Sequence, residues 1–280
     1  METVSEQRCF GGVQGTYRHA STETGGAMKF GLFRPPLGKG EKAPMLYFLA
    51  GLTCTEETFA IKAGAQRLAA ELGLILVTPD TSPRDTGIDG ATGDWEFGEG
   101  AGFYLDATTP PFASRFRMVS YVTKELPRVL AGAFAEADLG REAIFGHSMG
   151  GHGALTIALK NPDRYRSVSA FAPIVAPSQV PWGRKAFPRY LGDDTKVWRP
   201  YDSVALLEDG ARFPGMLLVD QGQADKFLDP QLQPWRLDTA ARAAGQALTL
   251  RLHAGYDHSY WFIQSFIEDH LLHHAAALHG

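Results

Sequence analysis

The chain has 280 residues, of which 44% are hydrophobic and 21% are charged, and its formal net charge is −4. This composition is ordinary for a folded globular protein and excludes a disordered, collagen-like or disulfide-scaffold chain. The lack of a basic stripe argues against a nucleic-acid partner, and no apolar stretch approaches the roughly 18 residues of a membrane span.

The N-terminal part of the chain, rich in Gly, Thr and Ser, is expected to form an antiparallel edge of a sheet. It includes a predicted strand at 28–33, which ends before Pro35 and Pro36. The first residues lack the basic and apolar regions of a secretory signal. Because the only cysteines are Cys9 and Cys54, too few for a disulfide framework, we expect a reducing, cytoplasmic location.

From residue 45 onward, strand and helix patterns alternate. Continuous apolar runs that end at turn residues predict buried parallel strands; these runs lie at 45–50, 74–77, 143–145, 168–171, 216–219 and 248–252. Helical patterns lie between them, at 62–72, 119–130 (with a kink or break at Pro127), 150–159, 230–244 and 260–278. The alternation predicts a doubly wound α/β fold in a single domain, 1–280, with a mostly parallel central sheet and helices on both faces. The segment 80–111 is too long for an ordinary loop, and we expect it to be functional.

The strongest local pattern is GHSMG at 146–150, between a predicted strand and a helix of small residues. This is the G-x-S-x-G motif in the context that it requires. Ser148 would lie on a sharp turn, where Gly146 and Gly150 remove Cβ atoms that would otherwise clash. The pattern indicates a nucleophilic serine at the carboxyl edge of the sheet; the alternative is a glycine-rich turn with an idle serine.

A serine nucleophile needs a base, and the base needs an orienting acid, which follow the serine in the order Asp or Glu, then His. Asp225 lies in the loop beyond the strand at 216–219, where it could reach back to an imidazole. Asp220 terminates that strand and remains the alternative. His258 follows the last strand, in the segment GYDHSY at 255–260, and is the candidate base.

The other histidines carry weaker signals. Those in or after the predicted terminal helix are expected to be solvated surface residues; they are His270, His273, His274 and His279. Three of them could share a helix face, but a zinc site would need a further convergent ligand, so no metal is expected. His147 and His152 flank the serine on a turn that directs successive side chains apart, and we expect no ligand role for them.

An acyl-transfer site also needs an oxyanion hole. The residue after the nucleophile supplies one backbone N–H, which here belongs to Met149. The second donor is expected in the loop AGLTC at 50–54, after an early strand. Gly51 allows close backbone approach there, and Leu52 is the expected donor.

Further segments fit one pattern in order: AGLTCTEETF at 50–59, DTSP at 80–83, GAGFYLDAT at 100–108, GHSMGGHGAL at 146–155, PWG at 181–183, KAF at 185–187, DQG at 220–222 and GYDHSY at 255–260. Together they resemble the S-formylglutathione hydrolases, also called the esterase D family, over nearly the whole chain. The resemblance implies an α/β-hydrolase fold. It also implies a catalytic triad and an oxyanion hole, formed by Ser148, Asp225, His258, Leu52 and Met149.

The resemblance also implies two substrate-binding residues. Cys54 matches a family cysteine that lies near the active site and is not the nucleophile, and Trp182 matches a tryptophan that lines the substrate channel. The chain departs from the usual family pattern at Ala50, 176–180, Arg184 and Trp261. These departures bear on substrate preference more than on chemistry.

The implied reaction is hydrolysis of S-formylglutathione to formate and glutathione through a formyl-serine, as a step of formaldehyde detoxification. The resemblance implies a homodimer, a small-molecule substrate and no cofactor.

Because glutathione carries carboxylates, Lys62, Arg184 or Lys185 could attract it; the alternative is that all three are solvated surface charges. The alternative function is a broad carboxylesterase for short acyl esters with the same triad. A non-catalytic α/β-hydrolase-fold binding protein is disfavoured because no triad member is missing.

Overall fold

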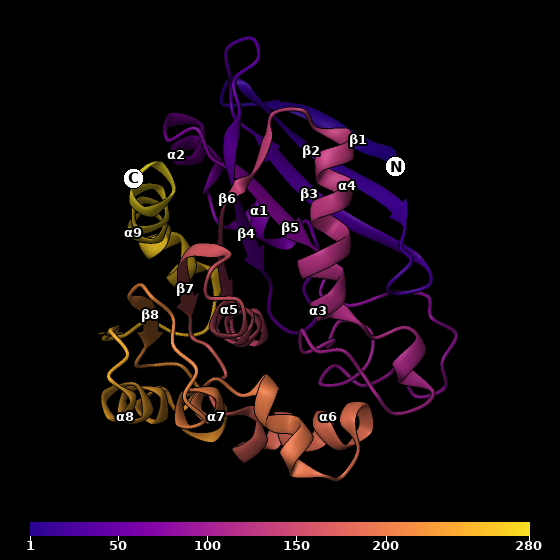
Figure 1. Ribbon diagram of the computed structural model, residues 1–280, viewed down its shortest axis with the longest axis vertical. Coiled ribbons are helices and arrows are strands. Elements are labelled where there is room, and N and C mark those ends of the chain that lie inside the picture. The colour runs from indigo at the N-terminus through magenta and orange to yellow at the C-terminus, as the bar shows by residue number, and fades with distance from the viewer.

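The computed structural model describes residues 1–280 and contains one nine-stranded sheet with helices packed on it (Figure 1). The strands are β1 (Glu2–Cys9), β2 (Gly12–Ala20), β3 (Ala27–Arg34), β4 (Ala43–Leu49), β5 (Ile75–Pro79), β6 (Ala137–His147), β7 (Tyr165–Phe171), β8 (Leu217–Gly222) and β9 (Leu248–His253). The helices are α1 (Thr58–Lys62), α2 (Gln66–Glu71), α3 (Met118–Ser120), α4 (Leu126–Ala133), α5 (Met149–Lys160), α6 (Pro181–Leu191), α7 (Ser203–Glu208), α8 (Pro234–Ala244) and α9 (Tyr260–His279).

The strand order across the sheet is β1-β2-β3-β5-β4-β6-β7-β8-β9. The pairs β1–β2, β2–β3 and β3–β5 are antiparallel, whereas every pair from β5 to β9 is parallel. The predicted fold class, a mostly parallel sheet with an antiparallel N-terminal edge, is therefore confirmed. This order places the carboxyl ends of β4, β6, β8 and β9 along one edge of the sheet.

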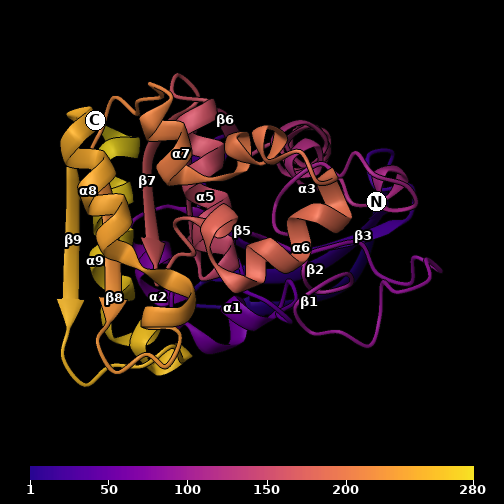
Figure 2. The same cartoon turned by 90° about the horizontal axis from the view of Figure 1, so that it is seen from below.

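Helices cover both faces of the parallel part. α5 and α9 contact the same central strands, β6 and β7, and lie on opposite sides of them (Figure 1). On the side of α5, α7 and α8 pack next to each other (Figure 2). Because both faces are covered, β4 is buried along its whole length, as its continuous apolar sequence predicts. None of the helices is long and apolar enough to cross a bilayer.

Three predicted helices differ from the structure. The helix expected at 230–244 begins only at Pro234, because Gln233 has a left-handed φ of 46°. The stretch 62–72 is not one helix, because α1 ends at Lys62 and α2 begins at Gln66. Between them Gly64 has φ +68°, a left-handed conformation that terminates a helix. The stretch 119–130 stays helical past Pro127, because a π turn precedes the proline: the Leu126 N–H bonds to the Tyr121 carbonyl with the wider spacing.

Candidate active site

Ser148 lies on the turn between β6 and α5, with φ 57° and ψ −119°. A Cβ atom on Gly146 would lie 2.3 Å from the Gly150 carbonyl oxygen, and one on Gly150 would lie 1.9 Å from the Leu49 carbonyl oxygen. Both separations are far below contact distance, so the turn requires glycine at both positions. This is the strained strand-turn-helix geometry of a nucleophile elbow.

His258 lies in the loop between β9 and α9, and its Nδ1 atom is 2.5 Å from Oδ2 of Asp225. Asp225 lies in the loop after β8, where its carboxylate also accepts hydrogen bonds from Gln221 Nε2 at 3.2 Å and from the Phe227 N–H at 2.8 Å. The carboxylate is thus buried and held from three directions. With Nδ1–H donating to Asp225, Nε2 is the nitrogen left to accept a proton.

The loop that carries His258 reaches the turn that carries Ser148. The ring centroids of His147 and His258 are 4.5 Å apart, and His147 immediately precedes Ser148. No hydrogen bond joins the Ser148 hydroxyl to His258, a contact that often tightens only when substrate binds. Ser148, Asp225 and His258 follow the carboxyl ends of β6, β8 and β9, so the sheet brings them to one edge.

The alternative acid, Asp220, is engaged elsewhere. Its fully buried carboxylate accepts hydrogen bonds from Nε and Nη2 of Arg251, each at 2.6 Å, and lies 3.3 Å from Nε2 of His270. Burial alone would raise the pKa of Asp220, but the His270 and Arg251 hydrogen bonds and charges lower it to about 2. Asp220 therefore forms a buried ion pair and makes no hydrogen bond to His258.

The expectation that the histidines of the terminal helix are solvated is wrong for His270 and His274. Both are fully buried between α9 and β7. His270 Nδ1 lies 2.7 Å from the Ser169 hydroxyl, and His274 lies 2.7 Å from the Ser167 hydroxyl and 2.8 Å from that of Ser169. Their rings are committed to a chain of internal hydrogen bonds that ties α9 to the sheet.

His147 and His152 are both buried, but only one has a partner. His152 Nε2 lies 2.9 Å from the Phe103 carbonyl oxygen, and burial lowers its pKa to about 4. Neither ring nitrogen of His147 has a hydrogen-bond partner, and burial holds its pKa well below the usual range. A neutral His147 therefore packs directly against His258.

The expected oxyanion donors belong to the residue after the serine, Met149, and to the loop that passes beside it. A Cβ atom on Gly51 would lie 3.2 Å from the Cβ of Ser148, so the loop after β4 passes directly beside the nucleophile. Neither the Leu52 N–H nor the Met149 N–H has an acceptor within the protein. Two unpaired backbone donors next to a serine are suited to holding a developing negative charge.

Trp182 and Cys54 contact different residues around the site. The Trp182 indole packs on Phe227, with centroids 4.7 Å apart, and Phe227 packs edge-on against His258 at 5.1 Å. Trp182 is nearly buried, and its indole N–H donates to Glu96 at 2.8 Å. Burial raises the pKa of the Cys54 thiol, while the nearby Thr58 and Tyr260 hydroxyls oppose the rise.

Sequence reasoning did not single out Phe227 and Tyr260. Phe227 separates Trp182 from His258, and its only sequence signal is an aromatic residue two positions after the candidate acid. Tyr260 begins α9, two positions after His258, and its buried hydroxyl has no hydrogen-bonded nitrogen or oxygen partner. Its ring lies 5.9 Å from that of His147, which in turn packs against the ring of His258.

Comparison with known families and sequences agrees with this geometry. Residues 21–273 match the esterase family that is described as "Putative esterase". An S-formylglutathione hydrolase of Paracoccus denitrificans is 52% identical over 279 residues, which cover 99% of this chain and 98% of that protein.

Two solved structures bear on the fold. The structure of an S-formylglutathione hydrolase from Agrobacterium tumefaciens superposes with a TM-score of 0.96 at 50% identity, covering 99% of this chain and 100% of the other. A fluorophosphonate-binding serine hydrolase of Staphylococcus aureus has a TM-score of 0.73 at 17% identity, covering 94% and 98% of the two chains. The second likeness concerns the fold alone.

Proposed function

The chain belongs to the S-formylglutathione hydrolases of the esterase family, and on that premise we propose that it hydrolyses S-formylglutathione to formate and glutathione. The observation that carries the proposal is the 52% identity to an S-formylglutathione hydrolase over 99% of the chain. The elbow serine, the buried Asp–His pair and the two free backbone donors are the parts that acyl transfer needs. The reaction would serve formaldehyde detoxification.

In the proposed mechanism, Ser148 Oγ attacks the formyl carbon while His258 Nε2 takes the hydroxyl proton. Asp225 keeps His258 in the required tautomer and stabilises the imidazolium that forms. The Leu52 and Met149 N–H groups hold the oxyanion of the tetrahedral intermediate. The C–S bond then breaks, and the glutathione thiolate leaves and takes the proton from His258.

The second half of the reaction uses water. His258 removes a proton from a water molecule, and the resulting hydroxide attacks the formyl-serine ester. The same two N–H groups hold the second oxyanion, and the Ser148 oxygen regains its proton from His258 as formic acid leaves and ionises to formate in water. Apart from the substrate and this water molecule, no step requires a group that the chain does not supply.

The proposal is tested by incubating the purified protein with S-formylglutathione and following both products. We expect formate and free thiol to appear in equal amounts and many times over per protein molecule, without any added cofactor. Thiol release without formate, or no release above the buffer rate, would contradict the proposal.

We also propose a cytoplasmic homodimer. Family resemblance supports the dimer, and the reducing location is supported by Cys9 and Cys54, which are both free thiols.

Among the three cations that could attract glutathione, Lys62 alone makes neither an ion pair nor a side-chain hydrogen bond. Lys185 Nζ is paired with Asp94 at 2.9 Å and with Glu96 at 2.6 Å, and Arg184 Nε faces the Ser178 carbonyl oxygen at 3.4 Å. Lys62 Nζ lies 5.8 Å from the centre of the Tyr260 ring. It lines a hollow of about 600 Å³ together with Ile61, Ser259, Tyr260, Trp261 and Gln264.

We propose that Lys62 pairs with a carboxylate of the glutathione moiety, because its hollow lies between α1, which follows the Leu52 loop, and α9, which follows His258. Lys62→Gln is expected to raise KM for S-formylglutathione about fivefold, the effect of losing one exposed ion pair of about 1 kcal/mol. Steady-state kinetics with the uncharged ester p-nitrophenyl acetate should show no change. The exposed Lys124, on the turn before α4, provides the control variant Lys124→Gln. An unchanged KM for the thioester, or an equal rise for both substrates, would refute the role.

A further inference from the structure

The loop that carries the Leu52 N–H has a strained backbone. We call residues 51–55 the oxyanion loop. The Cys54 N–H donates to the Gly51 carbonyl at 3.2 Å and closes a turn over Leu52 and Thr53. Thr53 has φ +67°, which is a genuine outlier for a β-branched residue. Such a conformation persists only when the surrounding structure imposes it.

Two peptide groups of this loop, Leu52–Thr53 and Cys54–Thr55, are held by the long segment 80–111. The Cys54 carbonyl accepts hydrogen bonds from the Thr81 hydroxyl at 2.7 Å and from Arg84 Nη2 at 2.9 Å. The Thr53 N–H donates to the Gly100 carbonyl at 2.8 Å. These contacts fix the peptide group that directly follows Leu52 and the one that follows Cys54. Because the Cys54 N–H also bonds to the Gly51 carbonyl, which shares a peptide with the Leu52 N–H, they constrain the direction of that N–H.

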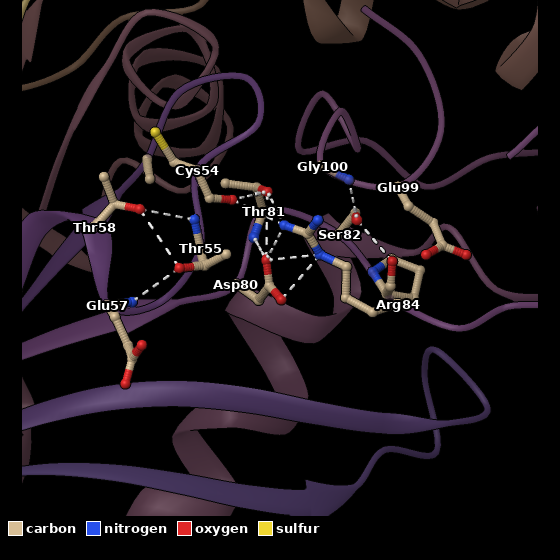
Figure 3. Close-up of polar contacts among 12 residues, drawn as sticks. Cys54, Thr55, Glu57, Thr58, Asp80, Thr81, Ser82, Arg84, Glu99 and Gly100 are labelled. Carbon is tan, nitrogen blue, oxygen red and sulfur yellow. Dashed lines mark hydrogen bonds and ion pairs between the residues drawn. The ribbon is translucent and has the colours of Figure 1, made fainter. Parts of the chain in front are cut away.

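Arg84 is itself fixed by Asp80, and Figure 3 shows its guanidinium between the Asp80 carboxylate and the Cys54 carbonyl. Arg84 Nη2 lies 2.7 Å from Asp80 Oδ1, and Nε lies 3.1 and 3.2 Å from the two carboxylate oxygens. Asp80 is 4% exposed and also accepts the Thr81 N–H at 2.7 Å. Its burial raises its pKa, and the Arg84 guanidinium opposes that rise.

The Gly100 side of the contact is equally well fixed. The Gly100 N–H donates to the Ser82 hydroxyl at 2.7 Å, as Figure 3 shows. The Glu99 carboxylate accepts the Asp85 N–H at 3.0 Å and the Thr86 N–H at 2.9 Å. Both parts of the segment 80–111 that bind the oxyanion loop, residues 81–84 and Gly100, are therefore fixed by further hydrogen bonds.

We propose that the Asp80–Arg84 ion pair is a positioning device for the oxyanion hole. Through the Cys54 carbonyl, it holds the strained loop so that the Leu52 N–H points at the carbonyl oxygen of the substrate. Neither side chain touches the reacting atoms. The inference rests on the proposed serine-hydrolase function, and it gives the segment 80–111 a defined task.

The test is Arg84→Gln, which keeps a hydrogen-bond donor but removes the positive charge and the bidentate contact with Asp80. Deleting one oxyanion donor costs about 10²- to 10³-fold in kcat, so misdirecting one is expected to lower kcat about 10- to 100-fold. KM should stay within about threefold, because the lost interaction is made only in the transition state. The apparent pKa of the kcat/KM profile should not move, since the Asp225–His258 pair is untouched. Arg84→Lys, which keeps the charge, should recover part of kcat.

Arg164 provides a matched control. Arg164 Nε lies 2.7 Å from Glu142 Oε2, and the two side chains are 24% and 5% exposed, against 32% and 6% for Arg84 and Asp80. Arg164 precedes β7, at the opposite edge of the sheet from Ser148. Arg84→Gln and Arg164→Gln should lower the melting temperature by similar amounts. Arg164→Gln should nevertheless leave kcat within about twofold of the wild type.

The proposal is overturned if folded Arg84→Gln keeps kcat within about twofold of the wild type, or if Arg164→Gln loses as much kcat. If Arg84→Gln does not fold, the double variant Asp80→Asn, Arg84→Gln leaves no unpaired buried carboxylate and is held to the same criterion. Each variant is assayed with S-formylglutathione and with p-nitrophenyl acetate. A wild-type protein that hydrolyses only the ester would refute the proposed substrate, while the ester assay would still decide the positioning role.

Discussion

Ser148→Ala is expected to lower kcat by about 10⁶-fold, the size of effect found when a triad nucleophile is removed. No other side chain can take its place, because the strained turn at φ 57° presents only this hydroxyl beside Gly51 and the free N–H of Met149. The fold should survive, since the Ser148 side chain makes no capping hydrogen bond and its N–H still donates to the Phe171 carbonyl.

Active-site titration with a fluorophosphonate gives the cleanest readout for this variant. The wild type should be labelled at one residue per chain, and Ser148→Ala should not be labelled. Circular dichroism of both proteins should coincide. A folded variant that keeps a tenth or more of the wild-type kcat would show that another group is the nucleophile.

Asp225→Asn is expected to lower kcat by about 10⁴-fold. The asparagine can keep the hydrogen bond to the Phe227 N–H, but its amide can donate a hydrogen to His258 Nδ1. The imidazole would then carry its proton on Nε2, the nitrogen that must accept the serine proton. The variant therefore retains the packing of the site and loses the base.

The measurement is kcat/KM as a function of pH, with Asp229→Asn as the control. Asp229 is an exposed carboxylate in the same connection after β8, so its loss matches the charge change without touching the imidazole. Asp229→Asn should behave as the wild type. If Asp225→Asn kept more than about a tenth of the activity at neutral pH, His258 would not depend on Asp225 for its tautomer.

The parallel strands were predictable because they are apolar on both faces and end at turn residues. The candidate triad could be located because G-x-S-x-G fixes the position of the serine and the strand ends fix those of the acid and the base. We propose that residues 1–280 form one domain, because Ser148, Asp225 and His258 approach one another only through strands of the same sheet.

What could not be predicted depends on a local backbone conformation or on contacts between distant residues. The break at Gly64 interrupts a sequence whose apolar period favours one continuous helix, and only its left-handed φ ends α1. The burial of His270 depends on Ser169, more than 100 positions earlier in the chain. Arg84 donates a hydrogen bond to the backbone carbonyl of Cys54. Because every residue has a backbone carbonyl, no side-chain pattern predicts this contact.

The central claim is that this chain is a thioesterase for S-formylglutathione, and the most direct test compares its kcat/KM for S-formylglutathione with that for p-nitrophenyl acetate. Specificity is the ratio of the two values, because it measures differential binding of the two transition states. We predict a ratio of about 100 or more in favour of the thioester, since its glutathione moiety adds binding interactions that a nitrophenyl group cannot make. A ratio below one would contradict the claim and identify the protein as a carboxylesterase for short acyl esters.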